Sequence, residues 1–200
     1  LSSKNKYFKN GIANSSGLVG KNLMLHPLGY VEGIFNDYLD SDFGPEGCCL
    51  YSHQFYETDK RNDYKRGFTL QVLRGSPPLE NALYLNKLKK LKFGKAFFKN
   101  FFNYYNRIIP IAVITEDLPI KSNYISLDYK NKDSSGLPGI KVNYRLEKNN
   151  KLILKNGVKK AKKLLEVAGA KQISAYAPVR YTGWHLMGTT KMGNKKNSSV

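Results

Sequence analysis

The chain has 200 residues, of which 41% are hydrophobic, enough apolar sequence for one compact domain or slightly more. It carries 33 basic against 15 acidic residues, and a net charge of +18 would ordinarily indicate a nucleic acid or an anionic membrane as a partner. Only 6 of the basic residues are arginine, which phosphate and base readers favour, so a genome rich in A and T is the simpler cause of the charge. No apolar run approaches the roughly 20 residues of a membrane span.

The first third of the chain predicts two strands separated by loops. Residues 1–27 are polar and have too little apolar surface for a core of their own, so they must lean on something larger. Residues 28–35 read as a strand, and the glycine-containing, acidic stretch 36–47 reads as a loop. Apolar residues alternate with polar ones from Phe68 to Leu73, which predicts a second strand.

A cationic, aromatic segment follows at residues 86–105. Its leucines and phenylalanines with interleaved lysines resemble a cationic amphipathic helix, which could lie on anionic lipid. Gly94 interrupts the pattern, and aromatic residues at helical spacing more often pack on their own domain. We therefore expect a packed helix, with membrane association as the less favoured alternative.

The second half predicts a buried strand, an antiparallel pair and a helix. Residues 108–115 are mostly apolar, and 123–128 and 140–145 are short β-like runs joined by turn residues at 130–136. A helix is predicted before Gly169, which is placed to end it. Its apolar face consists of Leu154, Val158, Ala161, Leu165 and Ala168, and its other, lysine-rich face should be exposed to solvent. The expected fold class is α+β, a mainly antiparallel β-sheet with helices on one side.

The cysteines and two of the three histidines give little sign of a site. Cys48 and Cys49 are adjacent, which excludes a long-loop disulfide and gives no spacing for a zinc site; we expect buried or inert thiols, with a strained vicinal disulfide as the alternative. A reducing, cytoplasmic location is slightly favoured. His53 is expected to be structural or on the surface, and His26 to orient the chain, since no second ligand follows at helical spacing. No metal site is predicted.

The third histidine lies in a loop of small residues. Residues 183–193 read Gly-Trp-His-Leu-Met-Gly-Thr-Thr-Lys-Met-Gly. Glycine lets the backbone come close to a planar cofactor, and an unperturbed imidazole titrates near working pH. This loop is therefore the first candidate for chemistry.

The loop and several other segments together resemble the glucose-methanol-choline (GMC) oxidoreductases, flavin enzymes that oxidise alcohols. Gluconate and choline dehydrogenase-like members are the most similar. The other segments follow in family order: Asn14 to Pro27, Phe55 to Asp59, Arg66 to Phe68, Glu116 to Pro119, Asn123, Leu127 to Asp128, Asp133 and Gly136 to Pro138.

This resemblance implies a domain organisation. Residues 28–180 would form the antiparallel substrate-binding domain, 1–27 a segment of an α/β FAD-binding domain, and 181–200 the start of the return to it. The family's Gly-x-Gly-x-x-Gly motif, which holds the FAD pyrophosphate at a helix N-terminus, does not occur in this sequence. The chain is therefore expected to be an internal to C-terminal fragment, inactive by itself, with a second active-site histidine or asparagine outside it.

The resemblance also implies residue roles. His185 would be the catalytic base, accepting the hydroxyl proton while hydride passes to FAD, and Trp184 and His185 would border the flavin. Phe55 and Tyr56 could line the alcohol pocket, although core packing is the favoured role. The implied substrate is a sugar, polyol or choline-like alcohol, and oxygen, a quinone or a cytochrome remain open as electron acceptor. A basic membrane-surface or nucleic-acid-binding module is the alternative, although no nucleic acid partner is expected.

Overall fold

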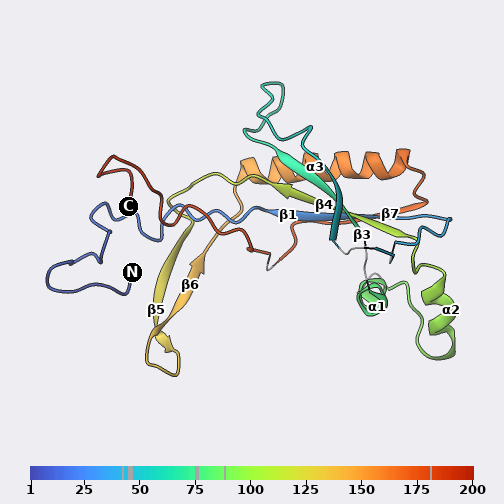
Figure 1. Ribbon diagram of the computed structural model, residues 1–200, viewed down its shortest axis with the longest axis horizontal. Coiled ribbons are helices and arrows are strands. Elements are labelled where there is room, and N and C mark those ends of the chain that lie inside the picture. Colours follow the sequence, from blue (N-terminus) through green and yellow to red (C-terminus); the bar gives the residue numbers. More distant parts are fainter. Residues whose placement is uncertain (42, 45–46, 75–76, 88, 181) are drawn as a thin grey trace. The chain divides into compact units, whose positions relative to one another are not determined.

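The computed structural model describes residues 1–41, 43–44, 47–74, 77–87, 89–180 and 182–200 (Figure 1). The chain divides into two compact units. Unit 1 comprises Leu1–His26, Asp117–Asn150 and Tyr181–Val200, and unit 2 comprises Pro27–Glu116 and Lys151–Arg180. Segments from both ends of the chain and from its middle therefore build unit 1.

Unit 2 contains a five-stranded antiparallel sheet with the order β2-β3-β4-β1-β7. Its strands are β1 (Leu28–Ile34), β2 (Gly47–Ser52), β3 (Phe68–Arg74), β4 (Ile108–Thr115) and β7 (Gln172–Tyr176). The predicted β1, β3, β4 and antiparallel pairing are confirmed. The edge strands β2 and β7 could not be predicted from the sequence, because most of their residues are exposed and carry no clear apolar alternation.

Helix α3 (Lys148–Val167) covers one face of this sheet (Figure 1). The core between them consists of Val31, Phe68, Leu70, Ile111 and Val113 from the sheet and Ile153, Leu154, Ala161 and Leu165 from the helix. Gly33 lies on this face too: an added Cβ would come within 2.9 Å of the Ala170 Cβ and 3.0 Å of a Leu165 methyl carbon. The predicted helix is confirmed, although it begins six residues earlier than its apolar face indicated.

The opposite face of the sheet is partly covered by α1 (Pro78–Lys87), η1 (Gly94–Ala96) and α2 (Phe97–Phe102). Ile34 and Ile108 point to this face because side chains alternate along a strand, and they form a second core cluster with Leu85 and Phe101. The expectation of helices on one side of the sheet is therefore wrong.

The single helix expected over residues 86–105 is also wrong. The chain leaves helical geometry after α1, where Lys89 has a φ of 57°, and Gly94 has a φ of 76°. Part of the aromatic surface of residues 86–105 is nevertheless packed, because Phe101 is buried. Phe93, Phe98 and Phe102 remain exposed. No helix among the described residues is long and apolar enough to cross a membrane.

Unit 1 contains the hairpin of β5 (Tyr124–Lys132) and β6 (Pro138–Asn143), with Leu127 opposite Ile140. The expected antiparallel pair is thus confirmed, with a longer first strand. Asn123 is buried beside it, and its side chain accepts a hydrogen bond from the Arg145 backbone N–H and donates one to the Arg145 carbonyl. This bidentate clamp closes the base of the hairpin.

Candidate active site

The loop that carries His185 is held against the N-terminal segment within unit 1. Met24 and Met187 exchange two backbone hydrogen bonds of 3.0 and 3.1 Å, and the Gly20 N–H donates to the Thr189 carbonyl at 2.8 Å. Gly188 has a φ of 89°, and an added Cβ would lie 1.9 Å from the Asn22 carbonyl oxygen. Glycine is therefore required there for the loop to meet the N-terminal segment so closely.

His185 lies beside a second histidine. The ring of His26 meets that of His185 edge to face, with centroids 5.5 Å apart and planes at 81°. His185 is exposed and His26 half-buried, and His26 holds a φ of 41° that few residues other than glycine adopt. From the sequence, His26 was expected only to orient the chain. No spacing signal connects two residues so far apart in the sequence, so only the fold could bring them together.

A buried carboxylate organises the backbone next to His26. The side chain of Asp117 accepts hydrogen bonds from the Leu25 N–H at 3.1 Å, the Tyr144 hydroxyl at 2.7 Å and the Asn150 amide at 2.8 Å. The pKa of Tyr144 is raised above its ordinary value, mainly by burial and further by its hydrogen bond to Asp117 and the charge of Asp117. Asp117 therefore ties the N-terminal segment, one residue before His26, to the segment Asp117–Asn150.

The loop of His185 exposes several apolar side chains. Trp184 and Leu186 are each 65% exposed and Met192 is 89% exposed. An exposed tryptophan and neighbouring apolar side chains suit a planar, largely apolar ring, which would cover them. The residues present therefore fit a flavin ring lying against this loop, with Trp184 and His185 as the side chains available to border it.

Other sequence candidates lie elsewhere. Phe55 stacks on Phe68 with centroids 5.0 Å apart and contacts the core under α3, so it packs rather than lines a pocket. Tyr56 is 46% exposed, and its ring is near that of His53. Cys48 and Cys49 are free thiols, and the expectation that they are buried is wrong, because both lie exposed on the edge strand β2. Among the described residues, no group of three or more histidine, cysteine or acidic side chains is arranged to hold a metal ion.

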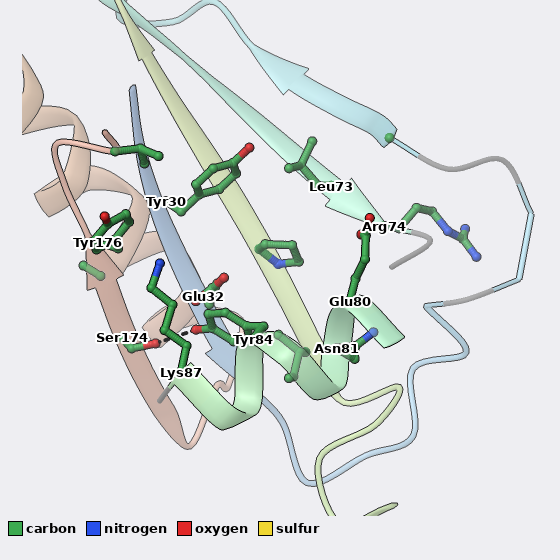
Figure 2. A pocket seen from close by; sticks show the side chains of 15 residues that line it. Tyr30, Glu32, Leu73, Arg74, Glu80, Asn81, Tyr84, Lys87, Ser174 and Tyr176 are labelled. Carbon is green, nitrogen blue, oxygen red and sulfur yellow. Dashed lines mark hydrogen bonds between the residues drawn. The ribbon is translucent and has the colours of Figure 1, made fainter. Parts of the chain in front are cut away.

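Unit 2 contains a cavity of about 720 Å³ on the sheet face that α1 covers (Figure 2). The carboxyl group of Glu32 on β1, the hydroxyl of Ser174 on β7 and the side chains of Tyr84 and Lys87 on α1 converge at one end. The Tyr84 and Ser174 hydroxyl oxygens lie 3.0 Å apart and share a hydrogen bond, and Ser174 is also hydrogen-bonded to Glu32. This cluster was not among the residues predicted from the sequence, although a glutamate inside an apolar strand was a usable signal.

The environment of Glu32 favours its protonated form. Burial raises the pKa of Glu32 to about 8, and the opposing effects of the Lys87 charge and the Ser174 hydrogen bond are smaller. Near neutral pH this carboxyl group can therefore donate a hydrogen bond as well as accept one.

Comparison with known proteins places the chain in a family. Residues 119–200 match the family model described as GMC oxidoreductase. The chain is also similar to 2-methyl-1,2-propanediol dehydrogenase of Mycolicibacterium austroafricanum, at 34% identity over 202 residues that cover 100% of this chain and 37% of that relative. The chain thus spans little more than a third of the length of the curated relative it matches. The resemblance carried by the histidine loop and its companion segments is confirmed, and the chain belongs to the GMC oxidoreductases.

Proposed function

We propose that this chain is part of an FAD-dependent oxidoreductase that oxidises an alcohol, with His185 as the proton acceptor. One observation carries the proposal: His185 is exposed and lies beside His26, in a loop with exposed apolar side chains. FAD, when bound, supplies the two-electron acceptor for the substrate hydride. In this proposal residues 28–180 serve the substrate, and residues 1–27 and 181–200 belong with the FAD-binding part of the protein.

The role of His185 follows from the balance of the reaction. Oxidation of a CH–OH group removes a hydride from carbon and a proton from oxygen, so a base must take the proton as the C–O double bond forms. A neutral imidazole accepts that proton on a ring nitrogen, and its exposure leaves it open to an incoming hydroxyl. His26, edge-on to the same ring, would limit the orientations that His185 adopts.

The substrate class has support from one relative. The Mycolicibacterium protein is named for a 1,2-diol, and the whole length of this chain aligns with a part of it. A small neutral alcohol is accordingly the proposed substrate, while the electron acceptor stays open among oxygen, a quinone and a cytochrome.

The test is the anaerobic reduction of flavin in the protein that carries this chain, loaded with FAD. Adding a polyol should bleach the yellow flavin, and His185→Ala should slow this reduction by about 100- to 10,000-fold, as expected for a lost general base. Lys191→Ala, an exposed change in the same loop, is the matched control and should leave the rate within about twofold. An unchanged rate in the His185 variant would contradict the assignment.

A further inference from the structure

The cavity under α1 has the chemistry of a ligand site that the proposed flavin loop does not use. We propose that it binds a neutral polyhydroxylated compound, a polyol or sugar, through Glu32, Tyr84 and Ser174, and that it rejects choline-like cations. The inference rests on the proposed function only where it identifies this ligand with the alcohol that is oxidised.

The polar end of the cavity is built to meet hydroxyl groups. Tyr84 and Ser174 share a hydrogen bond of 3.0 Å, and Ser174 is also bonded to Glu32, so three elements supply one connected chain of donors and acceptors. Each member retains hydrogen-bonding capacity beyond these contacts, since hydroxyl and protonated carboxyl groups both donate and accept. A ligand hydroxyl can likewise donate or accept, so it can join this hydrogen-bond network in either direction. A compound with no hydroxyl would instead leave the remaining donors and acceptors of these groups unmet on binding, at a cost in affinity.

Much of the remaining wall is apolar, although Arg74, Glu80 and Asn81 also line the cavity, and its size is suitable. Its walls include the side chains of Tyr30, Leu73, Ile108, Pro110 and Val179. The volume of about 720 Å³ falls within the range of ligand pockets, and an aromatic ring such as that of Tyr30 can cover the C–H face of a sugar or polyol. Hydroxyl groups at one end and carbon-bound hydrogens along the wall describe a polyol better than a simple alkanol.

The positive charges of the cavity are already engaged, which disfavours a charged ligand. The Lys87 ammonium group lies 4.2 Å from the centroid of the Tyr176 ring. It therefore occupies the aromatic face that a quaternary ammonium would need, and its charge repels a second cation. Arg74 donates to the backbone carbonyls of Asp40 and Phe43. An incoming anion would have to displace these contacts. Glu32, protonated near neutral pH, offers no counter-ion for a cation either.

The test measures binding to the purified chain by isothermal titration calorimetry, with no flavin present. The probes are propane-1,2-diol and glycerol, with propan-1-ol as the monohydric comparison and choline as the cation. We expect saturable binding of both polyols, weaker binding of propan-1-ol by about tenfold or more, and no binding of choline. Tyr84→Phe and Glu32→Leu should each weaken polyol binding by about tenfold, because each removes a hydrogen-bonding group, whereas Glu32→Gln keeps one and should stay within about threefold.

Tyr129→Phe, on the exposed part of β5 in unit 1, is the matched control and should bind polyols as the unchanged chain does. Circular dichroism identifies a variant that fails to fold, and Tyr84→Phe, which deletes one oxygen, then carries the comparison. The proposal is overturned if choline binds more tightly than the polyols, if no polyol binds, or if Tyr84→Phe leaves their affinity unchanged. Since these experiments need no flavin, such a result can stand beside His185-dependent flavin reduction, and the two proposals fail separately.

Discussion

At the scale of single residues, the contact between His26 and His185 gives the histidine loop a fixed partner. The two rings meet edge to face at 5.5 Å, and the Asp117 carboxylate holds the Leu25 N–H directly before His26. A base that must accept a proton at one geometry gains from such a constraint, because small misplacements of reacting groups are costly. His26 is accordingly a positioning residue for His185 in the proposed reaction.

Replacing His26 tests this role. In the FAD-loaded protein, His26→Ala should lower the rate of flavin reduction by about 10- to 100-fold with little change in KM, because His185 loses its orientation and not its substrate. His26→Phe retains a ring edge and should recover most of the rate. Stopped-flow reduction at several alcohol concentrations separates kcat from KM. A rise in KM alone, or a phenylalanine variant as slow as the alanine variant, would argue against positioning.

Glu32 predicts a pH dependence of stability in unit 2. Its pKa is about 8 in the folded chain against 4.5 for an unperturbed glutamate, so between these values the folded state keeps a proton that the unfolded state has lost. The stabilising contribution is complete below about pH 4.5, declines by at most about 1.4 kcal/mol per pH unit above it, and is lost beyond about pH 8. The ionisable side chains that line the same cavity are Tyr30, Arg74, Glu80, Tyr84, Lys87 and Tyr176.

Urea unfolding at several pH values between about 5 and 8 checks this expectation. Glu32→Gln should flatten the decline in the free energy of unfolding with rising pH, because an amide does not titrate. Glu57→Gln, an exposed change in unit 2 that does not line the cavity, is the matched control and should keep the decline. A wild-type chain whose stability rises across this range, or a Glu32 variant with an unchanged slope, would contradict the assignment of the proton to Glu32.

At the scale of elements, the close approach of α3 to the sheet depends on small residues at the contact. Gly157 lies on the helix face toward β4, and an added Cβ would come within 2.4 Å of a Val113 methyl carbon and 3.2 Å of the Phe68 ring. An alanine inside a helix ordinarily gains about 1 kcal/mol over glycine, but overpacking a core costs about 1–3 kcal/mol. The packing effect should therefore outweigh helix propensity at this position.

Gly157→Ala should consequently lower the free energy of unfolding by about 1–2 kcal/mol, measured by urea denaturation. Adding Val113→Ala to it should cost less than the sum of the two single changes, because the smaller side chain makes room for the new methyl group. Lys162→Ala on the exposed face of α3 should change stability by less than about 0.5 kcal/mol. A stabilised Gly157 variant would mean that the helix can move away from the sheet at little cost.

At the scale of the whole molecule, the charge of +18 describes composition more than a binding surface. The lysines of α3 lie on its exposed side, as expected of a solvated face, and Lys160 lies over the ring of Phe55. In the segment expected to be amphipathic, Phe101 packs against α1 and the sheet, whereas Phe98 and Phe102 of α2 stay exposed. The membrane-surface alternative thus loses the continuous helix on which it depended.

The division into two units also belongs to this scale. The segment Asp117–Asn150 groups with the two ends of the chain, whereas the resemblance to the family had assigned it to the sheet domain. Compactness and family domains need not coincide, and the hairpin in this segment contributes to unit 1 through Asn123 and Asp117. The landmarks Asp117 and Asn123 therefore mark buried hydrogen-bonding positions.

The sequence by itself determined the family, the α+β class, three central strands, the hairpin and the apolar face of α3. These depend on local periodicity and on short motifs, which are legible wherever one face of an element is buried. Tertiary structure alone decided the rest: the edge strands, the helices on the second face, the meeting of His26 with His185 and the cavity around Glu32. Each of these joins residues far apart along the chain, and burial, which sets the proton affinity of Glu32, exists only once those residues pack together.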